Sequence, residues 1–132
     1  MNRNLYLTLV TLLLASQAAR ADIVVVGNPG AAPLSKEQIS DIYLGKSQAA
    51  VPLDLPEASP LRASFYEKAT GKDPAQIKAT WARLAFTGKG QPPKEAADAA
   101  AVKKEVAANP KAIGYIDKSA ADASVKVLLT LP

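Results

Sequence analysis

An apolar segment that runs straight into a helix start is the feature of this chain that most restricts its fold. Residues 51–59 read VPLDLPEAS, a short strand followed by a turn. A helix is expected from Pro60, because the first helical position tolerates a residue without an N–H. Leu61, Phe65 and Ala69 then recur at four-residue spacing, which is one face of a helix. A strand that leads into a helix is typical of layered α/β folds.

The start of this helix is a candidate anion site. Backbone N–H groups at a helix start have no partner within the helix, and the helix dipole places a partial positive charge there. Ser59 precedes the helix and Arg62 lies in its first turn, so a hydroxyl and a forked guanidinium are available to an anion. The alternative is that Ser59 only caps the helix and Arg62 only faces water, because serine is among the commonest N-cap residues.

The first residues have the pattern of a secretory signal peptide. A short start that contains Arg3 precedes an uncharged apolar run over residues 5–15, and Ala19-Arg20-Ala21 is a small-x-small cleavage signature. The run is too short for a membrane span. We therefore predict a signal peptide over residues 1–21, cleavage after Ala21, and a periplasmic or secreted mature chain over residues 22–132 with no membrane span.

Composition argues against several function classes. The chain has no His and no Cys, so it lacks the commonest general base, the commonest transition-metal ligand and any reactive thiol. After cleavage, 16 basic residues less Arg3 and Arg20 leave 14 against 12 acidic residues, too small an excess for a nucleic-acid binder. We predict a protein that is not an enzyme, with no catalytic residue, no metal site, no cofactor and no nucleic-acid partner.

Residues 22–132 alternate between strand and helix patterns. Strands are expected at Ile23–Val26, Val51–Leu55, Ala112–Ile116 and Val125–Leu129; helices are expected from Ser35 to about Gly45, Pro60 to about Thr70, Asp73 to the loop at Thr87, and Lys94 to Ala108. This order predicts a single α/β domain in layers, with a mixed, largely parallel sheet flanked by helices. The apolar positions of these elements predict a core that includes Ile39, Phe65, Trp81 and Ile113.

Three segments, in this order, resemble the phosphate-binding proteins that serve ABC transporters, which are periplasmic binding proteins of type II. They are LSxxQIxxIYxGK at residues 34–46, the strand and turn that lead to the Ser59 helix, and NPxAIGYI at residues 109–116. Proteins of that family have two lobes that close on the anion. The resemblance implies that this chain corresponds to one lobe, the one that contains the phosphate loop.

The same resemblance implies that Ser59 opens the phosphate loop. Where the family usually has Ser-Gly-Thr, this chain has Ser59-Pro60-Leu61. The threonine hydroxyl is therefore replaced by an apolar side chain, and proline removes one N–H donor.

A second candidate anion contact is the loop TGKG at residues 87–90. Successive glycines let backbone N–H groups form a concave nest, and Lys89 adds a positive charge near Thr87. The alternative is that this loop only ends the preceding helix, with Gly88 in the left-handed cap position.

Together these patterns predict a periplasmic phosphate- or oxyanion-binding protein, similar to the substrate-binding protein of an ABC transporter. The predicted ligand-binding residues are Ser59, Leu61, Arg62, Thr87 and Lys89, and the predicted ligand is inorganic phosphate or another oxyanion. The predicted partner is an ABC transporter or another envelope protein. The alternative is a non-catalytic protein-interaction module of the cell envelope that has kept the fold and lost the ligand.

Overall fold

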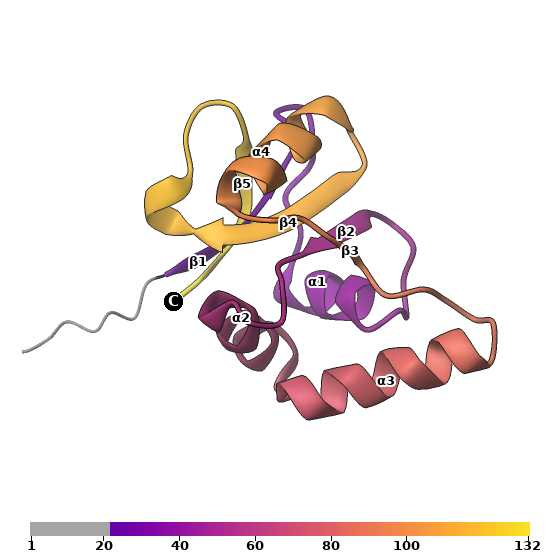
Figure 1. The fold of residues 1–132 in the computed structure, drawn as a ribbon. Coiled ribbons are helices and arrows are strands. Elements are labelled where there is room, and N and C mark those ends of the chain that lie inside the picture. The colour runs from indigo at the N-terminus through magenta and orange to yellow at the C-terminus, as the bar shows by residue number, and fades with distance from the viewer. Residues whose placement is uncertain (1–21) are drawn as a thin grey trace, which may run out of the picture.

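The computed structural model describes residues 22–132, which form one sheet with helices on both of its faces (Figure 1). The predicted signal peptide, residues 1–21, and its cleavage site lie outside the described residues. Within residues 22–132, no helix has both the length and the apolar character needed to cross a membrane.

The sheet has the strand order β3-β2-β4-β1-β5. Its strands are β1 (Ile23–Gly27), β2 (Val51–Asp54), β3 (Lys94–Glu95), β4 (Ala112–Asp117) and β5 (Lys126–Leu131). β2 pairs in parallel with β3 and β4, whereas β1 is antiparallel to both β4 and β5. In the described part of the chain, β1 alone runs against the other strands, so the prediction of a mixed, largely parallel sheet is confirmed.

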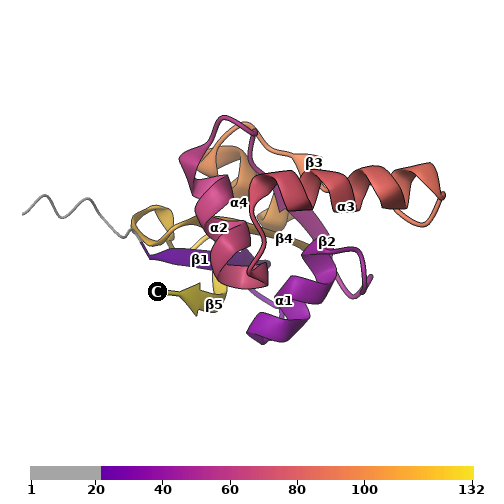
Figure 2. The same cartoon turned by 90° about the horizontal axis from the view of Figure 1, so that it is seen from below.

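The helices lie in layers around this sheet. They are α1 (Lys36–Tyr43), α2 (Pro60–Thr70), α3 (Pro74–Phe86) and α4 (Ala99–Ala108), with a 3₁₀ turn, η1, at Lys118–Ala120. Capping boxes begin α1 and α3, where the N-cap residues Ser35 and Asp73 each exchange hydrogen bonds with a glutamine three positions later. α4 covers one face of the sheet, α1 and α2 cover the other, and α3 lies outside them (Figures 1 and 2).

The prediction of a continuous helix over Lys94–Ala108 is wrong at its start. Lys94 and Glu95 form strand β3 and pair with β2, and α4 begins only at Ala99. The Asp98 side chain caps α4 by accepting a hydrogen bond from the Ala101 N–H at 2.9 Å. Alanine-rich composition favours a helix across the whole segment, but pairing with β2 satisfies the backbone groups of β3 instead.

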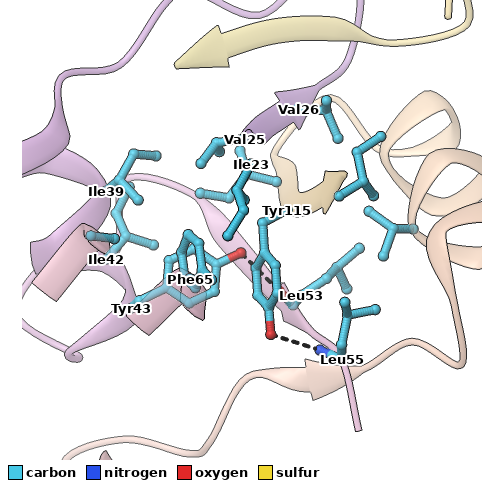
Figure 3. Close-up of a cluster of buried hydrophobic side chains, with 14 of the residues drawn as sticks. Ile23, Val25, Val26, Ile39, Ile42, Tyr43, Leu53, Leu55, Phe65 and Tyr115 are labelled. Atoms are coloured by element: carbon cyan, nitrogen blue, oxygen red, sulfur yellow. Dashed lines mark hydrogen bonds between the residues drawn. The ribbon is translucent and has the colours of Figure 1, made fainter. Parts of the chain in front are cut away.

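The core contains the residues that the sequence predicts. Ile39, Phe65, Trp81 and Ile113 are all buried, and Trp81, the most exposed of them, retains only 7% of its surface. Phe65 stacks on Tyr115, with ring centroids 3.9 Å apart, and Tyr43 meets Phe65 edge-on (Figure 3). Together with Tyr66, these rings form an aromatic cluster between α1, α2 and β4. Pairs of this kind each contribute about 0.5–1.5 kcal/mol beyond the burial of their surface.

Candidate functional site

A shallow depression of about 460 Å³ lies at the start of α2. Its lining includes Leu55 just after β2, Ser59 and Leu61 at the start of α2, Asp98 at the start of α4, and Asp117 at the end of β4. Two helix starts therefore meet beside the carboxyl ends of parallel strands. Ligands of open α/β sheets bind at this edge of the sheet.

Ser59 is the N-cap residue of α2, but its side chain makes no capping hydrogen bond. The Ser59 N–H donates to Pro56 O at 2.9 Å, and the Arg62 N–H donates to Ser59 O at 3.1 Å. Pro60 has no N–H to offer. The Ser59 hydroxyl and the Leu61 N–H are therefore the donors at this helix start that an anion could use.

The Arg62 guanidinium contacts β2 and β3 and does not line the depression. Its Nη1 donates to Leu55 O at 2.9 Å and to Glu95 Oε1 at 3.2 Å, and Nη2 lies 3.7 Å from Asp54 Oδ2. Burial acts to lower the pKa of Arg62, but the nearby Asp54 carboxylate helps to outweigh it, so the pKa is raised. Arg62 is thus a cation that already has two carboxylate partners.

Two carboxylates line the depression, and no Lys or Arg side chain does. Asp98 is held by its hydrogen bond to the backbone of α4. Asp117 Oδ1 accepts hydrogen bonds from the Ser119 N–H at 2.9 Å and the Ser119 hydroxyl at 2.8 Å, and these bonds lower the pKa of Asp117. An anion at the start of α2 would therefore meet a favourable helix dipole and two unfavourable negative charges.

Thr87 and Lys89 lie at the C-terminal end of α3, which points away from α2 (Figures 1 and 2). The Thr87 hydroxyl donates to a carbonyl of the last helical turn at 3.1 Å. Gly88 has a φ of 71°, so this loop ends α3 with a left-handed glycine. Lys89 lines a different depression, of about 330 Å³, together with Trp81. The structure does not bring Thr87 and Lys89 to Ser59.

Asp54, the last residue of β2, is a buried carboxylate with 2% of its surface exposed. Tyr66 Oη donates to Asp54 Oδ2 at 2.6 Å, Tyr115 Oη donates to Oδ1, and the Leu55 N–H donates to Oδ1 at 2.9 Å. Burial, and then the negative charge of Asp54, raise the pKa of both tyrosines well above the usual range.

No sequence pattern singles out the two tyrosines as partners of a carboxylate, although one signal for their role is present. Asp54 interrupts an otherwise apolar strand, and a carboxylate in the interior needs hydrogen-bond donors around it. Tyr66 comes from α2 and Tyr115 from β4. Only the folded chain shows that both reach the same carboxylate.

Comparisons with protein-family profiles and with curated proteins give no match. Solved structures do resemble this chain. One is assigned as a phosphate ABC transporter substrate-binding protein from Clostridium perfringens with bound phosphate; the TM-score is 0.64 at 23% identity, over 82% of this chain and 45% of that chain. Another is an ABC-type phosphate transport receptor from Vibrio cholerae; the TM-score is 0.59 at 19% identity, over 88% of this chain and 52% of that chain.

The chain spans about half the length of these two proteins. The match covers most of this chain, whose described residues form the five-stranded sheet and the helices on its faces. Sequence identity is low, so the likeness is one of fold. This chain has the fold of a single lobe of a periplasmic binding protein.

Proposed function

We propose that this chain is a non-catalytic binding protein of the cell envelope that holds phosphate or another oxyanion at the start of α2. The observation that carries the proposal is the depression of about 460 Å³ at that helix start, in a fold similar to part of a protein with bound phosphate. Ser59 would donate its hydroxyl and Leu61 its N–H, and the helix dipole would favour the negative charge.

Arg62 would join the bound anion by leaving Glu95, its more exposed partner, which retains 56% of its side-chain surface. Exposed ion pairs of this kind are worth only about 0–1 kcal/mol, so an anion can compete for the guanidinium. Thr87 and Lys89 would reach the same anion only if the loop after α3 moved toward α2.

A periplasmic location and a transporter or other envelope partner belong to the same proposal. They are supported by the signal-peptide pattern of residues 1–21 and by fold neighbours that are described as transport proteins. Cell fractionation in a Gram-negative host should recover the protein with the periplasmic contents. Recovery in the cytoplasm would contradict this part of the proposal.

Calorimetric titration of the purified protein with phosphate, sulfate and nitrate tests the ligand directly. We expect binding no tighter than micromolar, which corresponds to about −8 kcal/mol, because Pro60 removes one donor and the depression lies open on one lobe. Arg62→Ala should weaken binding by about 1.5–3 kcal/mol, the range for a hydrogen bond to a charged group. Lys46→Ala is the matched control, because it removes one exposed cation that does not line the depression, and it should leave affinity unchanged.

Two further variants should strengthen binding. Asp117→Asn removes a negative charge from the depression while keeping a side chain of the same shape, and we expect a gain of about 0.5–1 kcal/mol. The double change Pro60→Gly with Leu61→Thr rebuilds the Ser-Gly-Thr loop and adds an N–H and a hydroxyl. If the native chain and this double variant both fail to bind any of the three anions at millimolar concentration, the ligand proposal is wrong.

A protein-interaction module without a ligand is the second candidate function. It is favoured by the charge arrangement, since Arg62 is paired with Asp54 and Glu95 and the depression carries Asp98 and Asp117. Absence of anion binding, together with recovery of a specific envelope protein after cross-linking through residues of the depression, would support this candidate over the first.

A further inference from the structure

The feature that the proposed function leaves unused is the buried carboxylate of Asp54. It is the one charged side chain in the core of the described residues. Tyr66 Oη, Tyr115 Oη and the Leu55 N–H all donate to it, and Arg62 Nη2 lies 3.7 Å from Oδ2. A buried charge with this many donors is well compensated, whereas the same donors without the charge would be left unpaired.

These donors come from different parts of the fold. Tyr66 and Arg62 belong to α2, Tyr115 belongs to β4, and Leu55 follows β2. The four groups therefore surround one position from several elements.

Packing that does not involve Asp54 holds the tyrosines in place. The Tyr115 ring stacks on Phe65 with the planes 2° apart, and Tyr66 meets Phe65 edge-on at 5.2 Å between centroids. The Leu55 N–H also lies 3.2 Å from Tyr115 Oη (Figure 3). Removal of the carboxylate alone should therefore leave the donors close to their present positions.

We infer that Tyr66, Tyr115, the Leu55 N–H and Arg62 form a preformed cradle for a small carboxylate, and that the native occupant of this cradle is the chain's own Asp54 side chain. The cradle is separate from the depression at the start of α2, whose lining includes neither Asp54 nor the two tyrosines. Asp54 thus acts as an internal ligand, and it keeps the Arg62 guanidinium turned toward the sheet. When the side chain is removed, the cradle should accept an external carboxylate of matching size.

Asp54→Gly tests this inference, because it removes a CH₂–COO⁻ group that acetate replaces almost atom for atom. Thermal unfolding is measured in acetate and in chloride at the same pH and ionic strength. At an acetate concentration ten times the dissociation constant, the folding equilibrium constant of Asp54→Gly should rise about 11-fold over chloride. The native chain should show no such difference, because its cradle is already filled.

Two control variants show whether acetate acts at the cradle. Asp54→Asn fills the cradle with an amide and should not respond to acetate. Asp54→Gly combined with Tyr66→Phe and Tyr115→Phe keeps the cavity but lacks both hydroxyl donors, so its response should be lost. An equal response in the native chain, in Asp54→Asn or in the triple variant would overturn the inference.

If Asp54→Gly does not fold in chloride, a refolding experiment tests the same inference. Diluting the variant from urea into acetate should then raise the folded fraction above that in chloride, and Asp54→Ser, which also lacks the carboxylate, should respond in the same direction. If acetate raises neither the stability nor the refolded fraction of these two variants, the inference is wrong. None of these outcomes depends on whether phosphate binds at the start of α2.

Discussion

Trp81 is buried, but its indole N–H has no hydrogen-bond partner in the described part of the chain. A buried donor without a partner costs about 1–3 kcal/mol. The apolar ring therefore stabilises the fold, while its N–H opposes folding.

We expect two substitutions at Trp81 to distinguish the contribution of the ring to stability from that of its N–H. Trp81→Ala should lower the free energy of unfolding by about 3–5 kcal/mol, because it leaves a large cavity. Trp81→Phe keeps much of the ring and removes the unpaired donor, so its cost should be well below that of Trp81→Ala. Urea unfolding of both variants measures the difference. Equal losses would show that the indole N–H is satisfied in solution.

The raised pKa values of Tyr66 and Tyr115 predict an alkaline limit to stability. An unfolded tyrosine ionises near pH 10, whereas the folded pKa of these two residues lies higher, because of burial and then the charge of Asp54. Their contribution to stability is therefore complete below about pH 10 and falls as the pH rises above it, since the unfolded state then loses protons first.

Unfolding in urea between pH 9 and pH 12 tests this limit. In Asp54→Asn the negative charge is gone and burial remains, so the folded pKa values should move toward 10 and the fall in stability should level off at a lower pH than in the native chain. Tyrosinate absorbance should develop together with unfolding in the native chain. Ionisation of both tyrosines near pH 10 in the folded protein would contradict the expectation.

At the residue scale, burial could be predicted from the sequence and side-chain partners could not. The apolar periodicity correctly predicts that Phe65 and Trp81 are buried, because burial depends only on which face of its helix a residue occupies. The partners of Arg62 could not be predicted in this way. Glu95 is 33 residues away, and it lies on a two-residue strand that is too short to show a periodic pattern. Ligand binding by the five predicted residues stays a prediction. Of these five, only Ser59 and Leu61 line the depression at the start of α2.

At the scale of elements, most of the predicted strands and helices are present, and the error at Lys94–Glu95 comes from a long-range pairing. The two-residue strand β3 exists because its backbone pairs with β2, and a pairing of this kind is not encoded in the local sequence. The antiparallel direction of β1 is likewise set by distant partners. By contrast, the starts of α1 and α3 could be predicted because their capping residues are neighbours in the chain.

The contact between α4 and β4 should be sensitive to one added methyl group. A Cβ at Gly114 would lie 2.5 Å from Val102 Cγ1, too close for any real contact. Gly114→Ala should therefore lower the free energy of unfolding by about 1–3 kcal/mol, as expected for overpacking. Val102→Ala should recover part of the loss when combined with it, which a double-mutant cycle would report as positive coupling.

Gly30→Ala is the matched control for this contact. The nearest atom to a Cβ there is 3.6 Å away, and the residue does not have a left-handed backbone. Its effect should stay within about 0.5 kcal/mol. If Gly114→Ala is equally mild, α4 must shift on the sheet more easily than its packing indicates.

At the scale of the whole molecule, the order of the elements predicts the α/β class, and the resemblance in three segments predicts the single-lobe fold, which the solved structures confirm. The strand order could not be predicted in the same way, because it depends on which strands meet after long connections. The charge arrangement around α2 depends on the same connections, since they bring Glu95 to Arg62 and Asp117 beside Ser59.

Processing is a prediction for the whole chain. Cleavage after Ala21 should give a protein that starts at Asp22, one residue before β1 begins at Ile23. Intact-mass measurement of the exported protein checks the new N-terminus. A mature form that still carries the apolar run of residues 5–15 would indicate a membrane tether instead.

β1 lies between β4 and β5, so Ile23 pairs with Asp117 on one side and with Leu131 on the other. A ribosome therefore completes this strand long before it makes either neighbour. Until then a fully apolar segment has two open edges, which is the condition under which strands pair with other chains. Pairing across such a long separation also slows folding. The time between synthesis of the two ends is thus an interval in which chaperones can keep the chain unfolded and in which aggregation competes with folding.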